Sequence, residues 1–161
     1  MNTIAAKTPA NSDVTYLKSY NKTPSNHTLI KRKAEFDFDA DIPRFWQGEV
    51  FATRMLDAMQ LAFPDGERMF IQSIRNYEDK ITDPVLKRQV KEFIYQEAQH
   101  GIAHTEFTEM LTEQGLNVNG PVKLMKNMMV TFTDKAPKKV VLAATVAAEH
   151  LTASLGEFLV G

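Results

Sequence analysis

A glutamate and two histidines stand at spacings that bring their side chains together on one side of a helix. Glu97, His100 and His104 are separated by three and four residues. Three residues subtend about 300° of an α-helix, so Glu97 and His100 lie on adjacent turns of the same face. A carboxylate and an imidazole in this arrangement can bind one metal ion. Isolated pairs of this kind also arise by chance on helix surfaces, so the neighbouring residues decide which interpretation holds.

The neighbouring residues form a seam that is apolar at both ends and polar in the middle. Alternating steps of four and three residues along it give Leu86, Val90, Phe93, Glu97, His100, His104, Phe107 and Leu111. Such a stripe faces a protein core, where ionisable groups need partners that metal ions can provide. We therefore expect Glu97 and His100 to be metal ligands; the alternative is a buried hydrogen-bonded pair without a metal. His104 is expected to line the pocket or to support a ligand.

Composition limits the class of protein that can carry this seam. The chain has 161 residues, of which 43% are hydrophobic and 24% are charged, which is enough for one domain with a sizeable core. A formal net charge of −1 gives no reason to expect nucleic acid as a partner. The absence of cysteine excludes thiolate ligands and a cysteine nucleophile, which leaves carboxylates and imidazoles as the strong metal ligands.

The N-terminal quarter of the chain differs in character from the rest. Residues 1–42 are rich in Thr, Ser, Asn, Lys and Pro, and we predict a flexible or extended arm there. Within it, residues 30–38 alternate in polarity and could form an extended strip on the body of the protein. The arm has no apolar stretch of the kind a secretory signal needs, so we expect a cytoplasmic protein. A helical domain is predicted for residues 43–161.

Helical periodicity begins at Pro43, a residue suited to a first helical turn. Apolar residues then recur at helical spacing at Phe45, Ala52, Leu56, Met59 and Phe63. Residues 63–66, Phe-Pro-Asp-Gly, are predicted to interrupt the helix, and residues 67–81 are predicted to resume it. Glu67 stays in phase with the apolar residues on both sides, so it is a second carboxylate on a buried face.

A long helix is predicted between Asp83 and Gly115. Asp83 is a good N-cap acceptor, Pro84 suits the first helical position, and Gly115 is a good C-terminal stop. Residues 117–121 are expected to form a turn, and residues 122–132 a shorter helix. The chemical seam therefore lies in the middle of the longest helix of the chain.

The final segment, residues 137–161, is apolar on nearly every face. Glu149, His150 and Glu157 within it argue against an integral membrane span, and we expect a helix buried inside a bundle. Glu149 is then a third carboxylate surrounded by core. His150 follows about 100° around the helix, so it is expected to pack or to support the site from outside.

Together these elements predict an all-α fold, a bundle of antiparallel helices joined by short turns. Glu67, Glu149 and the Glu-x-x-His of the long helix then lie on the inner faces of three different helices. In some bundles, one glutamate from each of two helices and a Glu-x-x-His from each of the other two form a dinuclear carboxylate site. The three helices of this chain provide three of those four contributions.

Three motifs, in this order, resemble those of a known family. They are Phe63-Pro-Asp-Gly-Glu67-Arg-Met-Phe, Tyr95-Gln-Glu97-Ala-Gln-His100-Gly-Ile-Ala-His104 and Ala148-Glu149-His150-Leu-Thr-Ala153. The chain from Pro43 to Gly161 resembles the bacterial ferritin-like proteins catalogued as predicted metal-dependent hydrolases, and more distantly bacterioferritin and the di-iron carboxylate oxidases. The resemblance implies two iron ions, with manganese or zinc as alternatives. It also implies the metal ligands, which are Glu67, Glu97 as the bridging carboxylate, His100 and Glu149.

One feature of these relatives is missing from the chain, namely a second Glu-x-x-His on a later helix. Of the four histidines, only His100 has a glutamate three residues before it. We therefore expect the ferritin-like bundle to be incomplete, with the fourth ligand-bearing helix supplied by a longer chain beyond Gly161 or by the partner subunit of a homodimer. Without either, these residues would build a mononuclear site.

Three functions are compatible with these residues. In the first, two irons bind oxygen and oxidise a small organic substrate, and the apolar surroundings at Phe93, Phe107 and Leu111 favour this function. In the second, the metals activate water to hydrolyse a small-molecule substrate, as the family's description suggests. In the third, the helices form a non-catalytic metal-binding or structural bundle. The sequence favours oxidation and leaves the substrate open.

Overall fold

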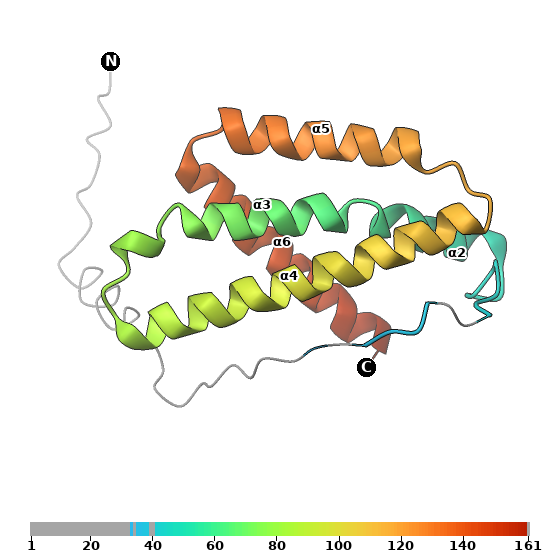
Figure 1. Ribbon diagram of the computed structural model, residues 1–161, viewed down its shortest axis with the longest axis horizontal. Coiled ribbons are helices and arrows are strands. Elements are labelled where there is room, and N and C mark those ends of the chain that lie inside the picture. The colour runs from blue at the N-terminus through green and yellow to red at the C-terminus, as the bar shows by residue number, and fades with distance from the viewer. Residues whose placement is uncertain (1–32, 34, 39–40, 161) are drawn as a thin grey trace, which may run out of the picture.

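The computed structural model describes residues 33, 35–38 and 41–160 of the chain. The described residues form an all-α bundle, as predicted (Figure 1). Most of the predicted N-terminal arm lies outside them. Within the described part of the chain, none of the helices has the length and apolar composition that a membrane span requires.

The helices follow one another up and down the bundle. They are α2 (Val50–Gln60), α3 (Phe63–Arg75), the short 3-10 helix η1 (Glu78–Lys80), α4 (Pro84–Glu113), α5 (Asn119–Lys135) and α6 (Lys138–Val160). α3 and α4 lie side by side in opposite directions and make the most extensive helix pair (Figure 1). α5 and α6 both pack on α3, and α6 crosses behind the α3–α4 pair.

Helix α4 begins and ends where the sequence predicts. The carboxylate of Asp83 accepts a hydrogen bond of 2.8 Å from the backbone N–H of Val85, and Pro84 occupies the first turn. At the other end, Gly115 has a φ of 85°, a left-handed conformation that favours glycine. These two signals fix a 30-residue helix with Glu97 near its middle.

The predicted start of the first helix is wrong. α2 begins at Val50 rather than at Pro43, because the side chain of Glu49 caps it. The Glu49 carboxylate accepts hydrogen bonds from the backbone N–H groups of Phe51 and Ala52, which have no partner inside the helix. Pro43 belongs to the segment that leads into this cap.

Three further boundaries differ from the prediction. Residues 63–66 form the start of α3 instead of interrupting a helix. Pro64 lies in the first turn, where backbone N–H groups have no partner inside the helix, so a proline costs no hydrogen bond there. The same helix ends at Arg75 rather than at Ile81. α5 begins at Asn119, inside the predicted turn. Glu67 therefore lies in the second turn of α3, close to its start.

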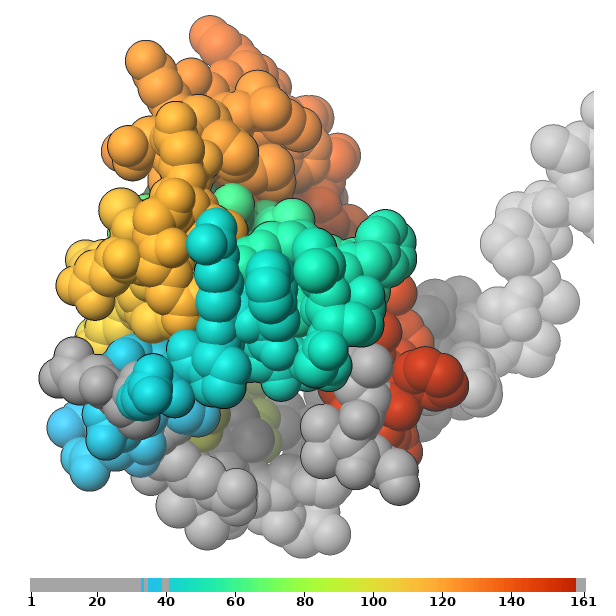
Figure 2. All heavy atoms as spheres, turned by 90° about the vertical axis from the view of Figure 1, so that its right-hand side faces the viewer, coloured from blue at the N-terminus to red at the C-terminus, as the bar shows by residue number. Residues whose placement is uncertain are grey.

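The apolar core lies where α2, α4 and the start of α5 meet. Its buried residues are Leu61, Met110, Leu111 and Val118. Phe38, from the N-terminal strip, packs against this core with its ring centroid 5.9 Å from that of Phe107. In Figure 2 the strip, in blue, lies near α4, in yellow, on the left of the view. The end of α6, in red, lies on the right. The described part of the predicted strip thus does lie on the body of the protein.

Helix α6 is not buried inside the bundle as predicted. Val141 and Thr145 are buried, but Val146 and Leu151 are 62% and 68% exposed. The hydroxyl groups of Thr145 and of Ser73 in α3 lie 2.9 Å apart and share a hydrogen bond. α6 therefore docks on α3 through one narrow face, and this contact positions the turn that follows Thr145, where the predicted ligand on α6 lies.

Candidate metal centre

Glu67 of α3 and Glu97 and His100 of α4 form a cluster of metal-ligating groups. Each offers one ligand atom that lies within 4.8 Å of the ligand atoms of the other two. The glutamates are buried, with only 6% and 5% of their surfaces exposed, whereas His100 is open to solvent. His100 Nδ1 lies 3.4 Å from Glu97 Oε1. The structure thus brings together three residues that the sequence predicts as ligands.

The two carboxylate oxygens of Glu67 have different surroundings. Oε1 lies 3.4 Å from Nε2 of His104. Oε2 is buried and accepts no hydrogen bond from the described residues. It lies against Gly101, where an added Cβ atom would come within 3.1 Å of it. A buried carboxylate oxygen without a hydrogen-bond donor is unfavourable, and a cation is a partner that would satisfy it.

The carboxyl groups of the site have raised pKa values. Burial, and next the charge of Glu97, raise the pKa of Glu67 to about 8. Burial and the same neighbour raise the pKa of Glu149 to about 7. Each shift shows that a further negative charge is unfavourable in this place. A bound cation would reverse that preference and hold the carboxylates in their ionised form.

The pKa values of the two histidines of α4 are shifted in opposite directions. The hydrogen bond with Glu97 raises the pKa of His100. Burial, and next the charge of His100, lower the pKa of His104 to about 4. His104 is therefore a neutral imidazole at physiological pH, with its ring centroid 4.8 Å from that of Phe63. A neutral imidazole can donate through one nitrogen and accept or ligate through the other.

The two predicted residues of α6 lie in different places. Glu149 is partly buried and lines a cavity together with the cluster, although it lies outside the group of ligand atoms within 4.8 Å of one another. His150 is exposed and does not line that cavity. The step of about 100° per residue separates these neighbours on the helix.

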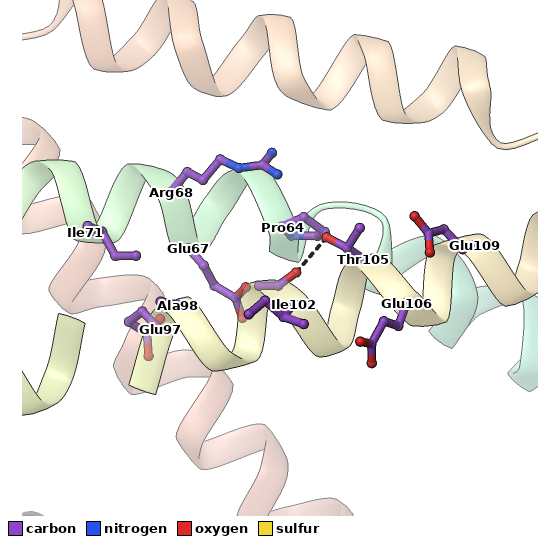
Figure 3. Close-up of a pocket in the computed structure, with 11 residues that line it drawn as sticks. Pro64, Glu67, Arg68, Ile71, Glu97, Ala98, Ile102, Thr105, Glu106 and Glu109 are labelled. Atoms are coloured by element: carbon purple, nitrogen blue, oxygen red, sulfur yellow. Dashed lines mark hydrogen bonds between the residues drawn. The ribbon is translucent and has the colours of Figure 1, made fainter. Parts of the chain in front are cut away.

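Two cavities touch the cluster. One, of about 430 Å³, lies between α3 and α4 and is lined by Glu67 and Glu97 (Figure 3). Figure 3 also shows Arg68 pointing away from Glu67, and its guanidinium pairs with Asp65 at 2.6 Å. The other cavity, of about 580 Å³, is lined by five polar residues of the site. These are Glu67, Glu97, His100, His104 and Glu149.

Gly101 belongs to the site, although it was not among the residues predicted from the sequence. A glycine in a helix interior costs about 1 kcal/mol relative to alanine, so its presence in the middle of α4 indicates a packing reason. Gly101 also follows Glu97 by four residues, which places it on the ligand-bearing face. These two signals mark Gly101 as a residue of interest on that face, but the approach of Glu67 to it is seen only in the structure.

Two buried carboxylates and a solvent-exposed imidazole that converge within a helical bundle define the class of protein: an all-α protein with a possible metal site. A family model described as predicted metal-dependent hydrolase matches residues 30–161, and the chain belongs to this family. The predicted family of metal-dependent hydrolases is thus confirmed, and the predicted relation to ferritin-like proteins and di-iron oxidases stays a prediction. No curated protein and no solved structure matches the chain.

Proposed function

We propose that this chain is a metal-dependent hydrolase whose metal ion is held by Glu67, Glu97 and His100, with Glu149 as a further ligand. The observation that carries the proposal is the convergence of buried carboxylates from α3 and α4 on one point, with Glu67 Oε2 lacking a hydrogen-bond donor among the described residues. Membership of a family described as predicted metal-dependent hydrolase supports the reaction class.

The donor atoms of these residues are of the kinds that bind divalent metal ions. Carboxylate oxygens and one imidazole nitrogen suit zinc, manganese and iron. A bound ion supplies a Lewis acid and lowers the pKa of a water molecule, which is the chemistry that hydrolysis needs. The chain's own contribution is a fixed set of ligands on rigid helices, with Glu67 and Glu97 kept out of bulk water.

His104 positions Glu67 in this proposal. Its Nε2 lies 3.4 Å from Glu67 Oε1, and the ring of Phe63 packs on its ring. Because His104 is neutral, an N–H on Nε2 can donate to Oε1 and leave Oε2 for the metal. Supporting hydrogen bonds of this kind orient metal ligands in proteins, and their loss weakens metal binding.

A ferritin-like arrangement with two metals is a further part of the proposal. It is supported by the resemblance of the three motifs to ferritin-like proteins. The sequence holds a single Glu-x-x-His, at Glu97 and His100, so a second metal needs ligands from outside these residues. A homodimer could supply them, and the ratio of metal to chain, measured together with the oligomeric state, would test this.

Oxidation of a small organic substrate at two irons is the second candidate function. It is favoured by the largely apolar walls of the 580 Å³ cavity, which Phe63 and Phe70 line together with the carboxylates. Apolar walls restrain reactive species, and iron accepts the same ligands as zinc and manganese. The identity of the metal and its redox response separate the two functions.

The test is metal analysis of protein purified without chelator, followed by activity after loading with Zn²⁺, Mn²⁺ or Fe²⁺. The hydrolase proposal predicts ester or amide cleavage that is lost on chelation and restored by zinc or manganese. Iron with an absorption that bleaches on reduction, together with oxygen consumption, would favour oxidation. Protein that binds none of these ions, with stability unaffected by them, would refute both enzymatic functions and leave a structural helical bundle.

A further inference from the structure

The cavity of about 580 Å³ has the dimensions of a small-molecule site. Ligand pockets of proteins commonly enclose about 300–1,000 Å³. Residues of α2, α3, α4, α5 and α6 all line this cavity, so its shape depends on the whole bundle. The metal-ligating cluster forms part of its wall. A molecule bound in the cavity would therefore lie directly against Glu67, Glu97 and His100.

The remaining walls of the cavity are mostly apolar. Large hydrophobic side chains from four helices contribute to them, namely Leu56, Met59, Phe63, Met69, Phe70, Met129 and Leu155. Apart from the five polar residues of the site, the polar side chains that line the cavity are those of Gln60 and Thr152. The cavity thus has one polar end, where ionisable groups gather, and an apolar remainder. This division suits a ligand with one polar functional group and an apolar body.

The charge of the cavity favours a neutral ligand. Glu67, Glu97 and Glu149 contribute a formal charge of −3 when ionised, and no Lys or Arg is among the described residues that line the cavity. One bound divalent ion would bring the sum to −3 + 2 = −1. A phosphate or carboxylate substrate would find no Lys or Arg side chain among these lining residues and would be repelled by the ionised glutamates.

We propose, on the basis of the proposed function, that the substrate is a neutral ester or amide with an apolar acyl group of several carbons. The carbonyl group lies at the cluster and the acyl chain lies along the apolar walls. In the reaction, the oxygen of water bonds to the carbonyl carbon and the bond from that carbon to the leaving oxygen or nitrogen breaks. One proton of the water is transferred to the leaving group, so a carboxylic acid and an alcohol or amine result.

Ala153 gives a way to fill the cavity without touching the cluster. It lies one turn after Glu149 on α6 and lines the apolar part of the cavity. Ala147 on the same helix is exposed, as Ala153 is, but it does not line the cavity. Ala153→Phe should occupy ligand space, whereas Ala147→Phe adds the same side chain to the same helix outside it. The second variant therefore controls for effects on α6.

The experiment has a binding part and an activity part. Binding of hexanamide and of hexanoate to the metal-free protein is measured by saturation-transfer NMR. Zinc-loaded protein is then assayed with p-nitrophenyl acetate, butanoate and hexanoate, and with p-nitrophenyl phosphate. We expect kcat/KM to rise about fourfold per methylene, because each buried methylene contributes about 0.8 kcal/mol. Hexanamide should bind and hexanoate should not. Ala153→Phe should abolish both the binding of hexanamide and the rise in kcat/KM with chain length, whereas Ala147→Phe should change neither.

The outcomes separate this inference from the proposed function. Equal cleavage of p-nitrophenyl acetate, p-nitrophenyl hexanoate and p-nitrophenyl phosphate would leave the hydrolase proposal standing but would overturn the proposed substrate class. If zinc binds and no ester is cleaved, the hydrolase proposal fails, while selective hexanamide binding that Ala153→Phe removes still supports a neutral, apolar ligand. If Ala153→Phe instead changes the dissociation of a dimer and leaves hexanamide binding unaltered, the cavity is an interface and the inference is wrong.

Discussion

Replacing Gly101 by alanine should weaken metal binding without destabilising the protein. Gly101 lies in the interior of α4, and the added Cβ atom would come within 3.1 Å of Glu67 Oε2. Ordinary van der Waals contacts of a Cβ atom begin near 3.4 Å, so the two atoms must separate by about 0.3 Å. Either the carboxylate turns or α3 moves away from α4. Both changes displace the proposed ligand atom.

The expected size of the effect follows from two opposing terms. Alanine is favoured over glycine in a helix interior by about 1 kcal/mol, which corresponds to roughly 2–4 °C in Tm for a protein of this size. Distances from metal to ligand must hold within about 0.2 Å, which is less than the required displacement. Disturbing groups around a metal commonly costs about 10–100-fold in affinity. We therefore expect an unchanged or higher Tm for the metal-free protein, and a Kd for zinc raised at least about tenfold.

Gly66→Ala is the matched control. Gly66 lies inside α3, beside Glu67 in the sequence, and a Cβ atom added there meets no atom within 4 Å. It gains the same helical preference without crowding the carboxylate. Zinc titration calorimetry and thermal denaturation of the metal-free proteins provide the two measurements. If Gly101→Ala binds zinc as tightly as the wild type, Glu67 Oε2 is not a ligand in this position and the proposed site is wrong.

Three further results are expected. Glu97→Ala and His100→Ala should each abolish zinc uptake, measured by metal analysis, while the far-ultraviolet circular dichroism stays helical, because both residues lie in mid-helix. Zinc binding at pH 7 should release roughly one to two protons, seen by calorimetry in buffers of different ionisation enthalpy, because the pKa values of Glu67 and Glu149 are raised to about 8 and about 7. The metal-free protein should lose stability between pH 6.5 and 8, measured by urea denaturation. In that interval Glu67, with its pKa raised to about 8, and His100, with its pKa raised, bind more protons in the folded than in the unfolded state.

Each of these results has a contrary outcome. Wild-type zinc content in either alanine variant would exclude the altered residue as a ligand. Zinc binding at pH 7 without proton release would mean that the glutamates are already ionised in the metal-free protein. Stability that rises between pH 6.5 and 8 would contradict the burial of Glu67. His104 has no part in that pH range, since its pKa is lowered to about 4 and its effect on stability ends near pH 6.5.

The sequence predicted the parts of the fold that depend on local signals. Asp83, Pro84 and Gly115 define the ends of α4 through capping and a left-handed turn, and the structure has both ends in place. Pro64 shows the limit of such signals. A proline both ends one helix and begins the next, and the short connection between α2 and α3 could not be told from a break within one helix.

The site was predictable to the extent that it depends on helical spacing. Glu97 and His100 share a face by their spacing alone, and the phase of Glu67 marked it as buried. The approach of Glu67 to Gly101 depends on how α3 and α4 pack, which the spacing on either helix does not contain. The exposure of α6 was missed for a similar reason. Its apolar faces do not reveal that only the face carrying Thr145 would find a partner in α3.

The claim that Glu67, Glu97 and His100 hold a metal ion is tested most directly by X-ray absorption spectroscopy of the zinc-loaded protein. Ligation by these residues predicts oxygen and nitrogen neighbours at about 2.0–2.2 Å and the scattering pattern of one imidazole per zinc, whereas His100→Ala is expected to retain no zinc. A wild-type protein that retains no zinc after dialysis, or a zinc spectrum without imidazole that is the same in the variant, would contradict the claim.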